Sequence, residues 1–113
     1  MEIVKQISVD ELSRMSERMY EPLVKAVVDV KRKELVVDME MHADGESYLL
    51  KHGSNQDDLW GINLYPGNFG KSTFIEYDSM INIRPRRDNP SRDVLDPAVR
   101  EEIKRIVIEV VHG

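Results

Sequence analysis

The stretch LVKAVVDVKRKELVVDMEM, residues 23–41, decides the fold. Apolar residues alternate with other residues on both sides of a charged segment, residues 31–34. Alternation with a period of two is typical of half-buried strands. We therefore expect strands over 23–30 and 35–41 that pair as an antiparallel hairpin.

The register of this hairpin follows from its apolar faces. One face is Val24, Ala26, Val28 and Val30, and the other is Leu35, Val37, Met39 and Met41. Matching them sets Val28 opposite Val37 and Lys25 opposite Glu40, whereas a slip of one residue would place apolar side chains against polar ones.

Three helices are expected around the hairpin. The capping box Ser8-Val9-Asp10-Glu11 begins a helix over about residues 8–20. Residues 46–52 fit a short second helix that follows an Asp44-Gly45 turn and ends at a left-handed Gly53. Asp96-Pro97 begins the third helix, because Asp is a good N-cap and Pro suits the first helical position. Its apolar stripe is Val99, Ile103, Ile106 and Val110.

The remaining strands complete the sheet. Residues 1–7 contain a possible short strand, residues 59–65 a further one, and residues 74–84 the longest, with loops over 66–73 and 85–93. The order (β)αββαββα predicts an α+β domain. We expect a four- or five-stranded, mainly antiparallel sheet with helices packed on one face, and a single domain over residues 1–113.

Composition bounds the function. The chain has 113 residues, no cysteine and a net charge of −5, which excludes a disulfide framework, a thiolate zinc site and a cysteine nucleophile. No apolar run reaches the roughly 18 residues of a membrane helix, and no secretory signal is recognisable, so a cytoplasmic protein without a membrane partner is expected. The acidic balance makes nucleic acid an unlikely partner.

Two segments resemble a known family: GSNQDDLWGINLYP, residues 53–66, and YDSMINIRP, residues 77–85. Together with the Val27–Val30 strand and His42-Ala43-Asp44, they are similar to a small prokaryotic family of single-domain proteins of unknown function. The resemblance runs nearly end to end. It implies a stand-alone domain and supplies no activity, cofactor or catalytic residue.

A polar face of the sheet is the first candidate site. Side chains alternate along a strand, so Asp38, Glu40, His42, Asp78, Asn82 and Arg84 are expected to share the face turned away from the core. Such residues can bind a hard cation or carry out acid–base chemistry, although a solvated face with cross-strand charge pairs is the simpler interpretation.

Asn63, Asp78 and Asn82 are poor strand formers. Residues that contradict local preference cluster at functional sites. The candidate ligand-binding residues are Asp78, Asn82, Arg84, Asn63 and His42.

Two loops are weaker candidates. The arginines of residues 84–93, among them Arg86, Arg87 and Arg92, could grip an anion, but neighbouring aspartates favour local ion pairs instead. Residues 67–73, GNFGKST, end like a phosphate-binding P-loop. That motif requires a glycine where Tyr65 stands and a following helix, so a hairpin loop is favoured.

No catalytic motif is present, and the cofactor stays unknown. His42 and Asp44 could supply two metal ligands, which is too few to assign a metal site.

Two hypotheses for the function follow. The first is a binding or interaction domain, acting by self-association or on a protein partner, with Val107, Ile108 and Val111 as a second apolar side of the last helix. The alternative is a small-ligand, metal-binding or hydrolytic site around Asp78, Asn82 and Arg84.

Overall fold

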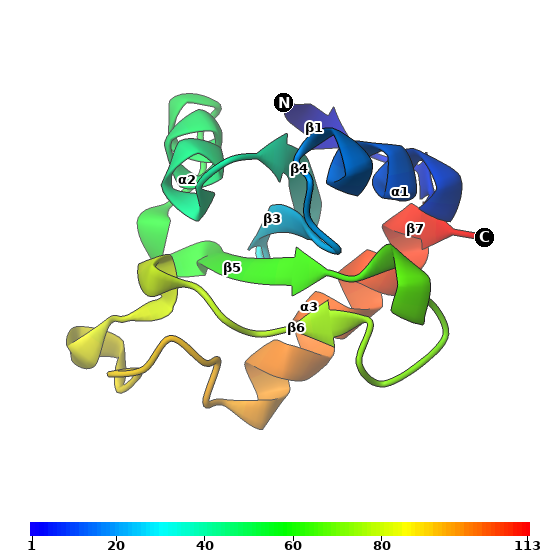
Figure 1. The fold of residues 1–113 in the computed structure, drawn as a ribbon. Coiled ribbons are helices and arrows are strands. Elements are labelled where there is room, and N and C mark those ends of the chain that lie inside the picture. The colour runs from blue at the N-terminus through cyan, green and yellow to red at the C-terminus, as the bar shows by residue number, and fades with distance from the viewer.

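The computed structural model describes all residues, 1–113, and has an α+β fold (Figure 1). The helices are α1 (Val9–Arg18), α2 (His42–Lys51) and α3 (Pro97–Val110). The strands are β1 (Glu2–Val4), β2 (Ile7–Ser8), β3 (Val24–Asp29), β4 (Glu34–Met39), β5 (Leu59–Leu64), β6 (Ile75–Glu76) and β7 (Val111–His112). Four short 3₁₀ helices lie at Gln56–Asp58, Pro66–Asn68, Met80–Asn82 and Pro85–Arg87.

The main sheet has five antiparallel strands in the order β1-β4-β3-β5-β6, and β2 and β7 form a small parallel pair. The predicted α+β class and the mainly antiparallel sheet are confirmed. The predicted caps of α1 and α3 are also confirmed, because Ser8 Oγ accepts from the Glu11 N–H and Asp96 Oδ1 accepts from the Ala98 N–H.

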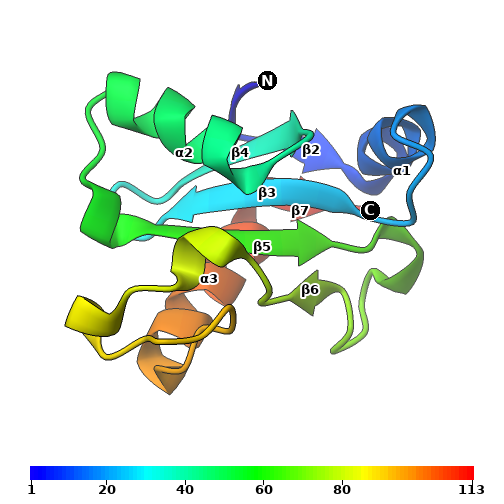
Figure 2. The same cartoon turned by 60° about the vertical axis from the view of Figure 1, so that its left-hand side comes forward.

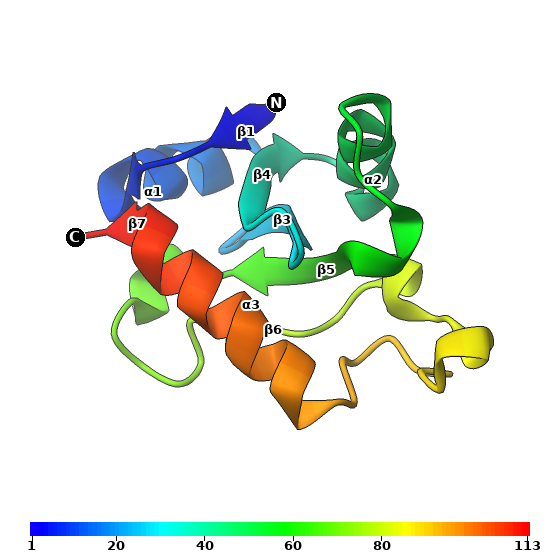
Figure 3. The ribbon, with the colours of Figure 1, turned by 180° about the vertical axis from the view of Figure 1, so that it is seen from behind.

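The helices cover both faces of the sheet, so the prediction of one covered face is wrong. Val24, Ala26 and Val28 of β3 belong to the larger core cluster, together with residues of α1 and α3. Val27 belongs to a second cluster with Leu49 of α2. Since neighbouring residues of a strand point to opposite faces, α2 and α3 lie on opposite sides of the sheet (Figures 2 and 3).

The hairpin forms as expected, but its register differs from the prediction. Val28 lies opposite Leu35, two residues from the predicted Val37, and Lys25 lies opposite Met39, one residue from the predicted Glu40. The cause is Asp29, whose buried carboxylate accepts hydrogen bonds from the backbone N–H groups of Lys31 and Arg32. These bonds make the turn shorter than predicted, so that Asp29 pairs with Glu34. The apolar faces still match at Val28, because a shift of two residues returns each side chain to the same face of the sheet.

A β-bulge at Asp38 ends the regular pairing of β4. Ala26 pairs with Val37 and Lys25 pairs with Met39, so Asp38 is the extra residue, and its φ is 71°. After the bulge, Met39 packs in the α2 cluster and Met41 is 62% exposed. The single apolar face predicted for residues 35–41 is therefore wrong beyond Val37.

Two further predictions of secondary structure are wrong. Residues 74–84 form a strand only at Ile75–Glu76 and then a 3₁₀ helix, because Asn82 takes over the pairing with β5 described below. Asp44 and Gly45 lie inside α2 rather than in a turn. A Cβ at Gly45 would approach Met39 Sδ to 2.5 Å and Val27 Cγ2 to 2.8 Å, so these side chains would have to move to admit any other residue.

The second apolar side expected for α3 is absent. Val107 and Val111 are buried in the larger core cluster, and only Ile108 is exposed, at 63%. The buried side of α3 is therefore wider than predicted, and its residues join the larger core cluster. Figure 3 shows α3 lying across this face of the sheet.

Candidate functional site

Asn82, expected on an open polar face, is buried and bonded to the edge of β5. Its Oδ1 accepts from the Gly61 N–H at 2.8 Å, and its Nδ2 donates to the Gly61 C=O at 2.9 Å and to the Arg92 C=O at 3.0 Å. Beyond the end of β6, the side-chain amide of Asn82 therefore makes the hydrogen bonds to β5 that the backbone of a neighbouring strand would otherwise make. Both of its hydrogens are used inside the fold.

Arg84 also makes internal contacts. Its Nη2 lies 3.5 Å from Oε2 of Glu46 on α2, and both side chains are largely buried. The guanidinium carbon lies 5.0 Å from the ring centroid of Trp60. Burial lowers the pKa of Arg84, and the Glu46 carboxylate opposes that shift. This arginine thus connects the segment after β6 to α2.

Asp78 lies at the surface, where its Oδ1 is 2.6 Å from Nε of Arg92. Exposed pairs of this kind contribute about 0–1 kcal/mol. Because Arg92 is engaged with Asp78 and Arg87 bonds the Asp57 carbonyl at 2.8 Å, these two arginines have separate partners. Arg86 is exposed.

His42, the first residue of α2, lies near Asn63 of β5. His42 Nε2 donates to the Ile62 C=O at 2.8 Å, and burial lowers the pKa of His42 more than this bond raises it. Asn63 Nδ2 donates to Oε1 of Glu76 at 2.8 Å and to the Asp78 C=O at 3.3 Å. The Oδ1 atom of Asn63 is buried without a hydrogen-bond partner.

The predicted site residues are thus distributed between the β5 edge, the α2 contact and the surface. No group of three or more His, Asp and Glu side chains is placed to hold a metal ion. A ligand-binding role for Asp78, Asn82, Arg84, Asn63 and His42, or an anion-binding role for Arg86, Arg87 and Arg92, stays a prediction.

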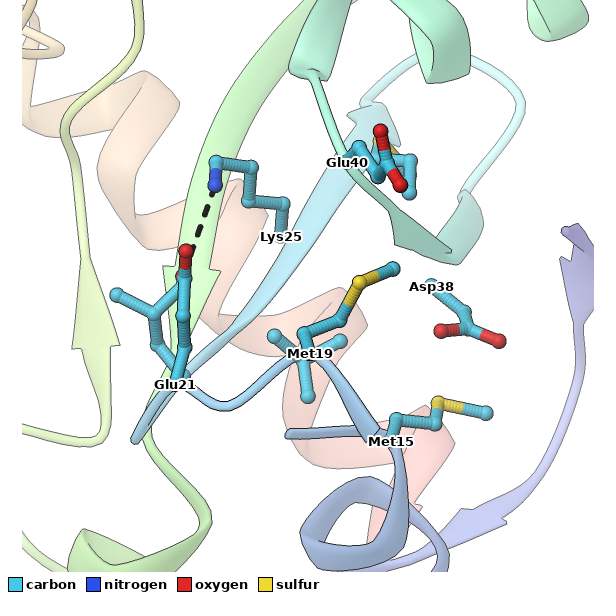
Figure 4. Close-up of a pocket in the computed structure, with 9 residues that line it drawn as sticks. Met15, Met19, Glu21, Lys25, Asp38 and Glu40 are labelled. Carbon is cyan, nitrogen blue, oxygen red and sulfur yellow. Dashed lines mark ion pairs between the residues drawn. The ribbon is translucent and has the colours of Figure 1, made fainter. Parts of the chain in front are cut away.

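A hollow lined by methionines lies elsewhere, between α1 and the ends of β3 and β4. Its volume is about 280 Å³. Figure 4 shows side chains from the end of α1 facing side chains from the bulged end of β4. The lining includes the methionines Met15, Met19 and Met39 and the charged residues Glu21, Lys25, Asp38 and Glu40.

A second hollow of about 470 Å³ continues the first toward α2. The two share Met19, Asp38, Met39 and Glu40, and the second adds Met1, Asp44, Ser47, Tyr48 and Lys51. We call the two hollows together the methionine groove. Four of the six methionines of the chain line it, beside four carboxylates and two lysines.

Tyr20, which lies in the chain between the lining residues Met19 and Glu21, has a backbone conformation that favours glycine. Its φ is 56°, and its side chain is 97% exposed. The N–H groups of Tyr20 and Glu21 donate to the carbonyls of Glu17 and Ser16, which is the Schellman arrangement that ends a helix. A tyrosine here places a large aromatic ring in solvent at a position that glycine would occupy at lower cost.

Asp38 lines the groove and also has a strained backbone. It is one of four non-glycine residues with positive φ in the chain, and its φ is 71°. Asp38 bonds Arg18 at 3.1 Å and Glu21 lies 3.7 Å from Lys25, whereas Glu40 and Asp44 are in no ion pair. Strained backbone of this kind is concentrated at binding sites.

This surface is not evident in the sequence. Met15 and Met19 have the helical spacing of an ordinary apolar stripe, and that pattern does not distinguish a groove from a core contact. The available signal was Tyr20, which directly follows the helix, where Gly or Asn is preferred. The bulge at Asp38 has no comparable signal in the sequence.

Comparisons with known proteins give a family and no activity. No curated protein and no solved structure matches the chain. No helix of the structure is both long and apolar enough to cross a membrane. The model of one family, described as a protein of unknown function (DUF5674), matches residues 1–110. This confirms the resemblance to a family of unknown function that runs nearly end to end. Because the match covers almost the whole chain, the protein belongs to the DUF5674 family.

Proposed function

We propose that the protein is a binding domain that holds a basic, apolar segment of a protein partner in the methionine groove. The observation that carries this proposal is the combination of methionine thioethers and carboxylates in two adjoining hollows that share four lining residues. Methionine side chains adapt their shape to different apolar partners, which is why they are frequent at peptide-binding surfaces.

Charge favours a cationic occupant. Glu40 and Asp44 line the groove without ion-pair partners, and the whole chain carries a net charge of −5. Lysines or arginines that flank an apolar stripe would meet these carboxylates while the stripe covers the methionines. Complementary charge of this kind accelerates encounter and selects against acidic partners.

Tyr20 supports a macromolecular partner rather than a small one. Its side chain is almost fully exposed and contributes nothing to the core, and its chain neighbours Met19 and Glu21 both line the groove. Tyrosine is enriched among the residues that dominate binding energy at protein interfaces. A partner segment that lies along the groove can cover this ring.

Self-association through strand pairing is less well supported. The outer strands β1 and β6 have three and two residues, and short edge strands limit pairing with a second copy. The neighbouring edge of β5 is occupied by Asn82. A protein partner other than a second copy is therefore the version we favour.

Fluorescence anisotropy with a labelled peptide tests the proposal. The probe is an amphipathic Leu/Lys peptide of about 14 residues, compared with a Leu/Glu peptide of the same pattern. We expect saturable binding of the basic peptide only. Removing the two unpaired carboxylates with Glu40→Gln and Asp44→Asn is expected to weaken it about three- to tenfold.

The matched control is Glu101→Gln with Glu102→Gln, which removes the same charge from the exposed surface of α3. This control is expected to bind nearly as well as the wild type. Equal loss in both double variants, or equal binding of the acidic peptide, would mean general attraction to an acidic protein and would contradict the proposal.

A further inference from the structure

Another pocket, separate from the methionine groove, lies beside the C-terminal half of α3. Its charged side chains are lysines, whereas those of the groove are mostly carboxylates. It is bordered by the loop before β6 and by the C-terminal half of α3, and its volume is about 540 Å³. That size is within the range of small-molecule sites. It shares no lining residue with the methionine groove. We call it the lysine pocket.

Its wall is apolar and partly exposed. Phe74 is buried and packs edge-on against Phe69, with ring centroids 5.3 Å apart. Phe69 and Ile108 are 42% and 63% exposed, and both line the pocket. An apolar chain that enters here would remove both side chains from water, at about 25 cal/mol for each Å² of apolar surface covered.

Two lysines supply the charge. Lys71 comes from the loop and Lys104 from α3, and neither is in an ion pair. No aspartate or glutamate lines the pocket, although the chain as a whole is acidic. The pocket is therefore a local cationic site beside an apolar surface.

We infer that the lysine pocket binds a small anionic amphiphile, a molecule with one carboxylate and an apolar chain of the fatty-acid class. The chain would lie against Phe69 and Ile108, and the carboxylate would be held between Lys71 and Lys104. This inference rests on the pocket alone and is independent of the proposed protein partner.

Titration of the ¹⁵N-labelled protein with decanoate, below its micelle concentration, tests the inference. Two probes separate the contributions: decyltrimethylammonium has the same chain with the opposite charge, and acetate has the same head without the chain. We expect saturable shifts of the Ser72, Lys104 and Ile108 amides with decanoate only. Equal affinity for decyltrimethylammonium or acetate, or shifts confined to other regions, would overturn the inference.

Variants of the pocket test which residues bind the carboxylate and which bind the apolar chain of the ligand. Lys71→Gln with Lys104→Gln is expected to weaken decanoate binding about three- to tenfold, because each exposed charge contact is modest. Ile108→Glu, at an exposed position that tolerates the change, is expected to abolish it. The control Lys5→Gln with Lys31→Gln removes the same charge elsewhere and is expected to bind as the wild type does. Equal weakening in this control would contradict the site.

Vesicles distinguish a dissolved ligand from a lipid surface. Co-sedimentation with vesicles that contain phosphatidylglycerol is expected to be weak and unaffected by Lys71→Gln with Lys104→Gln. Strong sedimentation that the same double variant abolishes would reassign the surface to membranes and overturn the inference.

Discussion

The side-chain amide of Asn82 pairs with both backbone groups of Gly61, accepting from its N–H at 2.8 Å and donating to its C=O at 2.9 Å. A Cβ at position 61 would approach Ser79 Oγ to 2.5 Å, so the glycine permits the close approach of the segment that contains Ser79. The pair extends the sheet sideways without a strand. It explains why a sequence that resembles a strand over 74–84 folds otherwise.

Replacing Asn82 with alanine is expected to lower the free energy of unfolding by about 2–4 kcal/mol. The change leaves two buried backbone groups of Gly61 unpaired, and each costs about 1–3 kcal/mol. Urea denaturation followed by circular dichroism measures the difference. Asn55→Ala, at an exposed residue, is the control and is expected to stay within about 0.5 kcal/mol. A loss as small for Asn82→Ala as for the control would mean that the amide does not hold the edge of β5.

Stability is expected to fall with acid through His42. Burial holds the pKa of folded His42 below 6.5, whereas in the unfolded chain this pKa returns to about 6.5. As the pH falls, the unfolded chain therefore takes up this proton before the folded protein does. The free energy of unfolding is highest above about pH 6.5 and declines as the pH falls below that value.

The variant His42→Gln retains a donor for the Ile62 C=O and removes the titration. Its free energy of unfolding is expected to change less between pH 7.5 and 5 than that of the wild type. His112→Gln, at the exposed C-terminal segment, serves as the control and is expected to retain the wild-type slope. Identical slopes for all three proteins would exclude His42 as the source.

Gly45→Ala is expected to destabilise the protein by about 1–3 kcal/mol, the cost of overpacking a filled core. The same change in an open helix would stabilise it by about 1 kcal/mol. The sign reverses because the new Cβ would lie 2.5 Å from Met39 Sδ and 2.8 Å from Val27 Cγ2. Thermal unfolding measures the effect, with Gly67→Ala as the control, because nothing lies within 4 Å of a Cβ there. A stabilising Gly45→Ala would show that α2 packs less tightly than the structure indicates.

Tyr20→Gly is expected to separate stability from binding. Glycine relieves the positive φ, so the free energy of unfolding is expected to stay equal or to rise by up to about 1 kcal/mol. Affinity for the Leu/Lys peptide is expected to fall at least about fivefold, as for an interface hot spot. Leu95→Ala, at another exposed apolar residue, controls for lost surface area. A variant that is less stable yet binds normally would show that Tyr20 serves the fold and not the partner.

The parts of the fold that local chemistry determines could be predicted from the sequence. The caps Ser8 and Asp96, the left-handed Gly53 and the apolar face of β3 follow from propensity and periodicity. The hairpin register could not be predicted, because it depends on how the buried Asp29 side chain bonds the turn. The bulge at Asp38 likewise depends on tertiary contacts.

The candidate site was harder to predict than the fold. Asn82 contradicts strand propensity, which correctly indicated an unusual position, but its unusual role is to bond Gly61. Met15 and Met19 have the spacing of ordinary core residues. Only the structure places them beside the bulge of β4, where they line a groove with Glu40.

The most direct test of the binding proposal is NMR of the methionine methyl groups during titration with the Leu/Lys peptide. The chain contains six methionines, and four of them line the methionine groove. We expect saturable shifts for Met15, Met19 and Met39, while Met80, which lies on the segment after β6 and is 70% exposed, stays unchanged. No shift at the groove methyls, or an equal shift at Met80, would contradict the claim that this groove is the site at which a partner binds.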